Sequence, residues 1–130
     1  MNDLYPRATH DLSRTRRELA PEAAAAFHGF SEAVFADGAL PTKTKHIVAV
    51  AVAHVTQCPY CIRGHTRAAL RDGASREELM EAIWVAAEMR AGAAFAHSII
   101  AIDEMGQTVA AANDHPRPAP GPGEPHGHSI

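Results

Sequence analysis

The apolar run at residues 47–53, Ile-Val-Ala-Val-Ala-Val-Ala, restricts the fold of this chain more than any other feature. Its β-branched residues suit a buried strand by propensity alone. However, the periodic segment extends over about fifteen residues, from Pro41-Thr42 to Thr56, which is a helix length, and no partner strand is evident elsewhere. We therefore expect a helix buried nearly all round, in an all-α fold.

Start and stop signals predict further helices on both sides of this segment. Pro21 opens a helix that Asp37-Gly38 ends. Pro59 suits the first turn of another helix, which continues through Leu70 and stops at Asp72-Gly73 with a glycine C-cap.

Two more helices are expected after this stop. Ser75 and Glu78 form a capping box for the first of them. The second is expected from about residue 93 to residue 110, with Phe95, Ile99 and Ile102 at core spacing. With the N-terminal segment, the prediction is a compact helical domain of five to six helices.

The length and composition allow one domain and a tail. The chain has 130 residues, of which 46% are hydrophobic, and its 27 alanines favour close helix packing. We expect residues 1–112 to form the helical domain. Residues 113–130 are rich in Pro, Gly and His and have almost nothing apolar to bury, so they are expected to be a flexible tail.

Charge and hydropathy argue against two classes of partner. The formal net charge is -3 and no basic run exceeds Arg16-Arg17, so nucleic acid and anionic membranes are not expected as partners. The longest apolar run is far shorter than the roughly 20 residues that span a bilayer. Residues 1–20 are too charged for a signal peptide. These features predict a soluble, cytoplasmic protein.

The chemistry of the chain is concentrated at its only two cysteines, Cys58 and Cys61. A pair with this spacing on the first turn of a helix suits redox chemistry or metal binding. The helix N-terminus lowers thiol pKa values, an effect that on its own favours Cys58 as the nucleophile. His65 lies four residues after Cys61 on the same face, where it can accept the thiol proton, and this favours Cys61.

Residues 40–94 resemble the alkylhydroperoxidase D and carboxymuconolactone decarboxylase-like family. The matching text is Leu-Pro-x-Lys-Thr-Lys, an alanine- and valine-rich helix, Gln-Cys-Pro-Tyr-Cys-Ile-x-x-His and Gly-Ala-Ser-x-Glu-Glu-Leu. The resemblance implies an all-α fold, obligate oligomers that are often trimers or hexamers, and thiol-based peroxide reduction. It also implies that Cys61 is the peroxidatic thiol, Cys58 the resolving thiol and His65 their proton-transfer partner.

The sequence departs from the family pattern at His46. The family has a glutamate at this position, twelve residues before the first cysteine, and the carboxylate completes a proton relay. An imidazole here can still shuttle protons at a near-neutral pKa. It also creates an alternative, since His46, Cys58, Cys61 and His65 together are a plausible Cys2His2 set for a tetrahedral metal such as zinc.

The predicted function is therefore that of a thiol peroxidase or disulfide oxidoreductase acting on hydroperoxides. An external dithiol must supply the electrons, because the chain has no further cysteine and no nucleotide-binding glycine motif, and no cofactor is expected. A metal-binding oligomer and a noncatalytic oligomeric domain are the alternatives. Decarboxylation is poorly supported, because the decarboxylase branch of the family does not rely on this cysteine pair.

Overall fold

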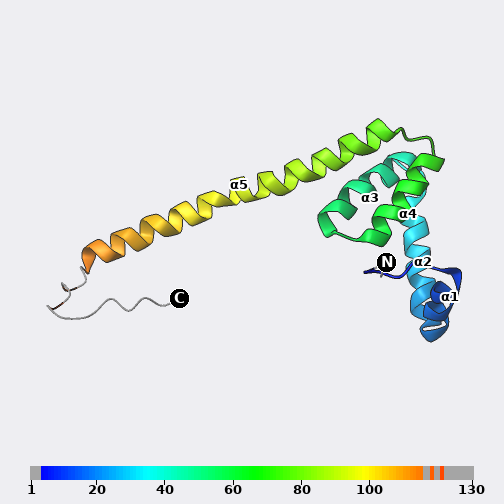
Figure 1. The fold of residues 1–130 in the computed structure, drawn as a ribbon, viewed down its shortest axis with the longest axis horizontal. Coiled ribbons are helices and arrows are strands. Elements are labelled where there is room, and N and C mark those ends of the chain that lie inside the picture. Colours follow the sequence, from blue (N-terminus) through cyan, green and yellow to red (C-terminus); the bar gives the residue numbers. More distant parts are fainter. Residues whose placement is uncertain (1–3, 116–117, 119–120, 122–130) are drawn as a thin grey trace. The chain divides into compact units, whose positions relative to one another are not determined.

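The computed structural model describes residues 4–115, 118 and 121, and within these residues it is all helical, as predicted. This part of the chain forms five helices, whose arrangement can be followed in Figure 1. In chain order they are α1 (His10–Leu19), α2 (Pro21–Phe35), α3 (Thr42–Thr56), α4 (Pro59–Arg71) and α5 (Arg76–Asp114). Helix α1 lies in the N-terminal segment, for which no helix bounds were predicted, and the Thr9 side chain caps it by accepting a hydrogen bond from the backbone N–H of Leu12 at 3.3 Å.

Helix α3 confirms that the 47–53 run is helical, but only one of its faces is buried. Val50 is fully buried and Ala53 is 2% exposed. Val48 and Val52, on other faces of the helix, are 49% and 51% exposed, so the expectation of burial nearly all round is wrong for the single chain. Val55, near the end of α3, is also exposed, at 42%.

A link of two residues joins α3 to α4 and folds them into a helical hairpin. Its first residue, Gln57, has a φ of 56° in the left-handed region that favours glycine. This conformation lets the backbone N–H groups of Gln57 and Cys58 both donate to the carbonyl of Ala53, which ends α3. The hairpin buries a small core whose members are Val50, Ala69, Ala74 and Leu79, with Ile47 and Ile83 packed against it.

The segment that carries the first family motif fastens α2 to α3. Thr42 donates its backbone N–H to Asp37 at 2.8 Å and its hydroxyl to the carbonyl of Phe35 at 2.7 Å. The Lys45 ammonium donates to the carbonyls of Val34 and Ala36, at 2.8 and 2.6 Å. The positive charge therefore satisfies the carbonyl end of α2 and fixes it beside the first turn of α3.

The two helices expected after Gly73 are one continuous helix, α5. The capping box at its start is confirmed, because Glu78 accepts from the Ser75 backbone at 3.1 Å and donates its own N–H to the Ser75 hydroxyl at 3.0 Å. The prediction of a break before residue 93 is wrong. No proline or capping residue separates the two parts, and a single Gly92 is tolerated inside a helix.

The chain divides into two units, Met1–Arg90 and Ala91–Ile130. In the described part of the second unit, every residue from 93 to 115 is exposed. Phe95, Ile99 and Ile102 were expected in the core and are instead 82%, 70% and 62% exposed. Helix α5 also occupies the first two positions of the predicted tail, most of which lies outside the described residues.

Helix α5 contains a stretch apolar enough to cross a membrane. Its mean hydropathy over 18 residues reaches 1.3, and only 6% of that stretch is buried. This feature was missed because the apolar residues are spread among small and polar ones rather than forming a run. Length and composition alone do not identify a membrane span, since core helices of soluble proteins have the same character.

Candidate functional site

The structure brings the four predicted site residues together in two pairs. Cys58 and Cys61 lie at the start of α4, and His46 of α3 meets His65 of α4 across the hairpin. All four side chains are partly buried. The two-residue link between the helices is what allows residues 19 positions apart to face each other.

Cys58 is the N-cap residue of α4, and its sulfur takes the place of the usual capping oxygen. The backbone N–H of Cys61 donates to the Cys58 sulfur at 3.3 Å. Hydrogen bonds from the Cys61 thiol and from the Cys61 backbone lower the pKa of Cys58. The geometry therefore favours a thiolate at Cys58 in the reduced pair.

Cys61 has the opposite character. Its hydrogen bond to Cys58 and its burial raise the pKa of the Cys61 thiol. Of the two thiols, Cys58 therefore loses its proton first, and Cys61 keeps its proton when the pair carries a single negative charge. The negative charge thus lies on the cysteine nearer the N-terminus of α4, as the helix dipole alone predicts. His65 is hydrogen-bonded to His46, and within the described residues it has no hydrogen bond with either sulfur.

The two histidines form a stacked cluster with Phe35, the last residue of α2. Their Nδ1 atoms are 3.0 Å apart, and the Phe35 ring stacks on both imidazoles with centroid distances of 4.7 and 4.8 Å. Burial, together with the neighbouring His46, lowers the pKa of His65. His65 is therefore a neutral imidazole at physiological pH, in the state that can accept a proton.

Asp72, just after the end of α4, places a carboxylate beside His46. Its Oδ2 lies 3.9 Å from His46 Nε2. At this distance the carboxylate is a neighbouring negative charge and not a hydrogen-bond partner. One of the two Nδ1 atoms donates to the other. When His65 is the donor, its Nε2 atom keeps the lone pair that a base requires.

Phe35 and Asp72 are the site residues that sequence reasoning missed. Asp72 was interpreted only as part of the Asp-Gly stop signal of α4. The signal that could have pointed to it is the absence of the family's glutamate at position 46, which directs attention to other carboxylates near His46.

The alternative of a Cys2His2 metal site is not supported by the geometry. In the described part of the chain, no group of three or more His, Cys, Asp or Glu side chains is arranged to hold a metal ion. The Nδ1 atoms of His46 and His65 face each other. The Cys58 sulfur instead accepts a hydrogen bond from the Cys61 backbone N–H. The four residues therefore form a thiol pair and an imidazole pair.

Comparison with known proteins agrees with the resemblance seen in the sequence. The carboxymuconolactone decarboxylase family matches residues 21–104. Among curated proteins, "uncharacterized protein 4 in cox locus" of Paracoccus denitrificans is 55% identical over 103 residues, which are 77% of this chain and 92% of that protein. An uncharacterized protein of Cupriavidus necator is 42% identical over 72 residues, which are 55% of this chain and 64% of that one.

Two solved structures share the fold. The crystal structure of a carboxymuconolactone decarboxylase family protein from Legionella pneumophila has a TM-score of 0.56 and 39% identity, covering 61% of this chain and 70% of that one. A crystal structure of a protein from Methanobacterium thermoautotrophicum has a TM-score of 0.61 and 38% identity, covering 64% of this chain and 93% of that one.

The lowered pKa of His65 predicts a pH-dependent stability. Near pH 6 the unfolded chain binds more protons at this residue than the folded chain, so the free energy of unfolding rises with pH there. The stability from neutral His65 is present above the unfolded pKa of about 6.5 and is lost as pH falls through the folded value. Urea unfolding of His65→Gln should show a weaker loss on acidification than the parent. His10→Gln, at an exposed position, is the control, and an unchanged slope for His65→Gln would refute this origin.

Proposed function

The chain belongs to the carboxymuconolactone decarboxylase family, and from this we propose that it is a thiol-dependent peroxidase that reduces hydroperoxides through Cys58 and Cys61. The observation that carries the proposal is the Cys58 sulfur at the N-cap of α4, bonded by the Cys61 N–H at 3.3 Å. This contact stabilises negative charge on one sulfur and holds the second within reach of it.

The proposed cycle has three balanced steps. The Cys61 thiolate attacks the O–O bond of a hydroperoxide, which breaks to leave a sulfenic acid on Cys61 and an alkoxide; the alkoxide takes back the proton that the histidine pair accepted from Cys61 and leaves as an alcohol. The Cys58 thiolate then attacks that sulfur and forms the Cys58–Cys61 disulfide, and the displaced hydroxide takes a proton from solvent and leaves as water. An external dithiol reduces the disulfide by exchange and is itself oxidised to a disulfide.

We assign the first attack to Cys61 because His65 follows it by one turn on the same face of α4 and is a neutral base. By taking the proton of Cys61 during the attack, this base offsets the raised pKa of the Cys61 thiol. Cys58, with its lowered pKa, then attacks the sulfenic acid as a thiolate. The base beside Cys61 thus serves the attack on the peroxide, and the lowered pKa of Cys58 serves the formation of the disulfide.

In this mechanism the proton from Cys61 leaves through the histidine pair. His65 accepts it at Nε2 and passes its Nδ1 proton to His46, whose protonated ring is stabilised by the Asp72 carboxylate. Asp72 acts through His46 and is therefore a positioning residue. It provides the carboxylate that the family pattern has at position 46.

The electron donor is a second molecule, since the cycle consumes both cysteines of the chain. We propose a small or protein-bound dithiol as this donor. We also propose a cytoplasmic location, because free thiols persist in reducing compartments.

The cysteine roles predict different outcomes for two serine variants. Cys61→Ser should abolish peroxide consumption, since it removes the attacking sulfur. Cys58→Ser should lose turnover but still form a sulfenic acid on Cys61, which a dimedone adduct detects by mass spectrometry. Treating the parent protein with mild peroxide should remove two hydrogens from the single peptide that carries both cysteines. A sulfenic acid only on Cys58, in the Cys61→Ser variant, would reverse the assignment.

The relay predicts a change in the pH profile for Asp72→Asn. The variant removes the negative charge beside the proposed proton acceptor, so Cys61 alkylation in the Cys58→Ser background should begin at higher pH, and peroxide turnover should fall about tenfold or more. Asp103→Asn, on exposed α5, is the matched control. His46→Glu restores the family carboxylate and should preserve or raise turnover. A slower rate with an unmoved pH profile would show that Asp72 has only a structural role.

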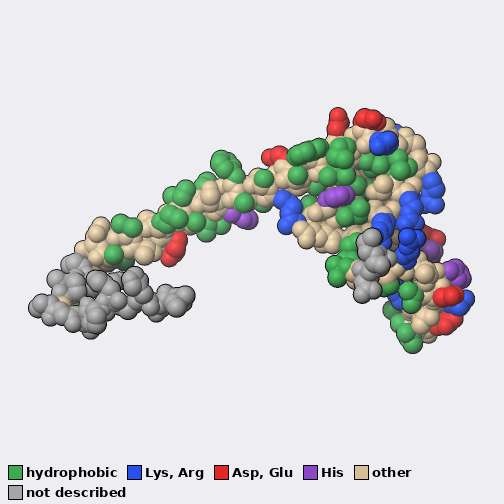
Figure 2. Space-filling view, in the orientation of Figure 1, with side chains coloured by type: hydrophobic (Ala, Val, Ile, Leu, Met, Phe, Trp, Pro, Cys, Tyr) green, Lys and Arg blue, Asp and Glu red, His purple; other side chains and the backbone are tan. Residues whose placement is uncertain are grey.

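We also propose that the chain assembles as a homo-oligomer, a trimer or a hexamer. Figure 2 shows hydrophobic side chains along the second part of α5. Six large ones between residues 93 and 110 are at least 60% exposed. These residues are Phe95, Ile99, Ile100, Ile102, Met105 and Val109. An apolar helix of this kind requires a cover, and a second copy can provide one through close packing at the neighbouring alanines.

Light scattering of the full chain should therefore give a mass of three or six subunits. Ile102→Glu should dissociate the assembly, because a buried carboxylate without a partner is strongly unfavourable. Gln107→Glu, which adds the same charge at a polar position of α5, should leave it intact. A folded monomer, or a protein recovered only from detergent-solubilised membranes, would contradict the proposal.

A further inference from the structure

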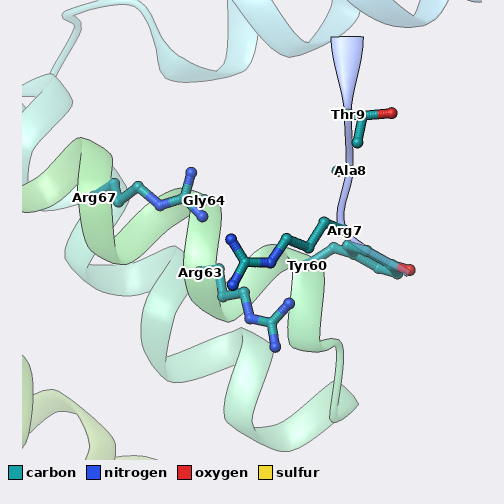
Figure 3. A pocket seen from close by; sticks show the side chains of 7 residues that line it. All are labelled: Arg7, Ala8, Thr9, Tyr60, Arg63, Gly64 and Arg67. Carbon is teal, nitrogen blue, oxygen red and sulfur yellow. The ribbon is translucent and has the colours of Figure 1, made fainter. Parts of the chain in front are cut away.

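A surface hollow of about 600 Å³ lies between the N-terminal segment and α4. Figure 3 shows that Arg7 extends from the N-terminal segment toward α4, which contributes Arg63 and Arg67. Tyr60 and Gly64 form the remaining part of the wall on α4. Neither cysteine lines the hollow, because it faces a different side of the helix from Cys58, Cys61 and His65.

The hollow gathers positive charge on a chain whose formal net charge is -3. Arg63 and Arg67 are one helical turn apart, a spacing at which like charges repel. In the part of the chain that the structure describes, none of the three arginines forms a salt bridge with a carboxylate, in contrast to Arg14, which pairs with Asp11 at 2.8 Å. Three guanidinium groups around one hollow are stabilised when an anion lies among them.

A tertiary contact holds the third arginine over α4. The Tyr60 hydroxyl donates to the carbonyl of Pro6 at 2.7 Å, and the Tyr60 ring packs edge-on against Tyr5 with a centroid distance of 6.1 Å. Both contacts fix the segment immediately before Arg7. The arginine is therefore positioned by residues other than itself, which reduces the entropy lost when it binds a ligand.

We infer that this hollow binds a small organic anion that carries two or more carboxylate or phosphate groups. A guanidinium forms paired, charge-assisted hydrogen bonds with either group, and three of them match more than one such group. The volume fits a small molecule rather than a single simple ion. Gly64 leaves the floor open, since a Cβ at this position would meet nothing within 4 Å.

Titration calorimetry of the reduced full-length chain tests this inference independently of peroxidase activity. The probes are citrate and pyrophosphate at constant ionic strength, with acetate as a singly charged comparison. We expect binding of at least one multivalent probe, and tighter binding of citrate or of pyrophosphate identifies carboxylate or phosphate as the preferred group. Arg63→Gln and Arg67→Gln should each weaken binding about tenfold or more. Arg71→Gln, which removes an exposed charge at the end of the same helix, should change it less than about twofold.

Two further variants separate a shaped site from general attraction by charge. Gly64→Leu keeps all three arginines but fills the open floor, so it should weaken binding while leaving the helix folded. Tyr60→Phe removes the bond to Pro6 and should weaken binding by releasing Arg7. Circular dichroism confirms that each variant is folded.

Three results would overturn the inference. One is that neither multivalent probe binds in the millimolar range. Another is that Arg71→Gln weakens binding as much as Arg63→Gln, which would indicate unspecific attraction. The third is that Gly64→Leu binds as tightly as the parent, which would place the anion outside the hollow.

Discussion

The packing of α3 on α4 is the contact on which the rest of the first unit depends. A single left-handed residue, Gln57, allows the two helices to turn back on each other over two residues. Their contact fully buries Val50 and Ala69, and the start of α5 adds Leu79 and Ile83 to this small core. With so few buried side chains, losing the hairpin would remove most of the apolar burial of the unit.

The same hairpin creates the chemistry of the site. The short link places Cys58 at the N-cap of α4, a position that serine or aspartate usually occupies. It also brings His46 against His65, and the hydrogen bonds of Thr42 and Lys45 hold Phe35 over both rings. One turn therefore fixes both an acidified thiol and a desolvated imidazole.

The position where the sequence departs from the family pattern has a carboxylate beside it. His46 stands where that pattern has a glutamate, and Asp72 Oδ2 lies 3.9 Å from its Nε2 atom. In the mechanism that we propose, the imidazole adds one more carrier to the path of the proton, and Asp72 supplies the negative charge that the glutamate supplies in the family pattern.

The sequence by itself determined the local features: helix type, four of the helix starts, the capping box at Ser75 and the spacing of the thiol pair. These depend on propensity and on contacts within a few residues, which a linear pattern records. Other features were decided only by tertiary structure. They are the pairing of His46 with Asp72, the lowered pKa of His65, the placement of Arg7 by Tyr60 and the exposure of α5 beyond residue 92. Each depends either on contacts between residues that are distant in sequence or on the burial of side chains from water. Both arise only when the chain folds.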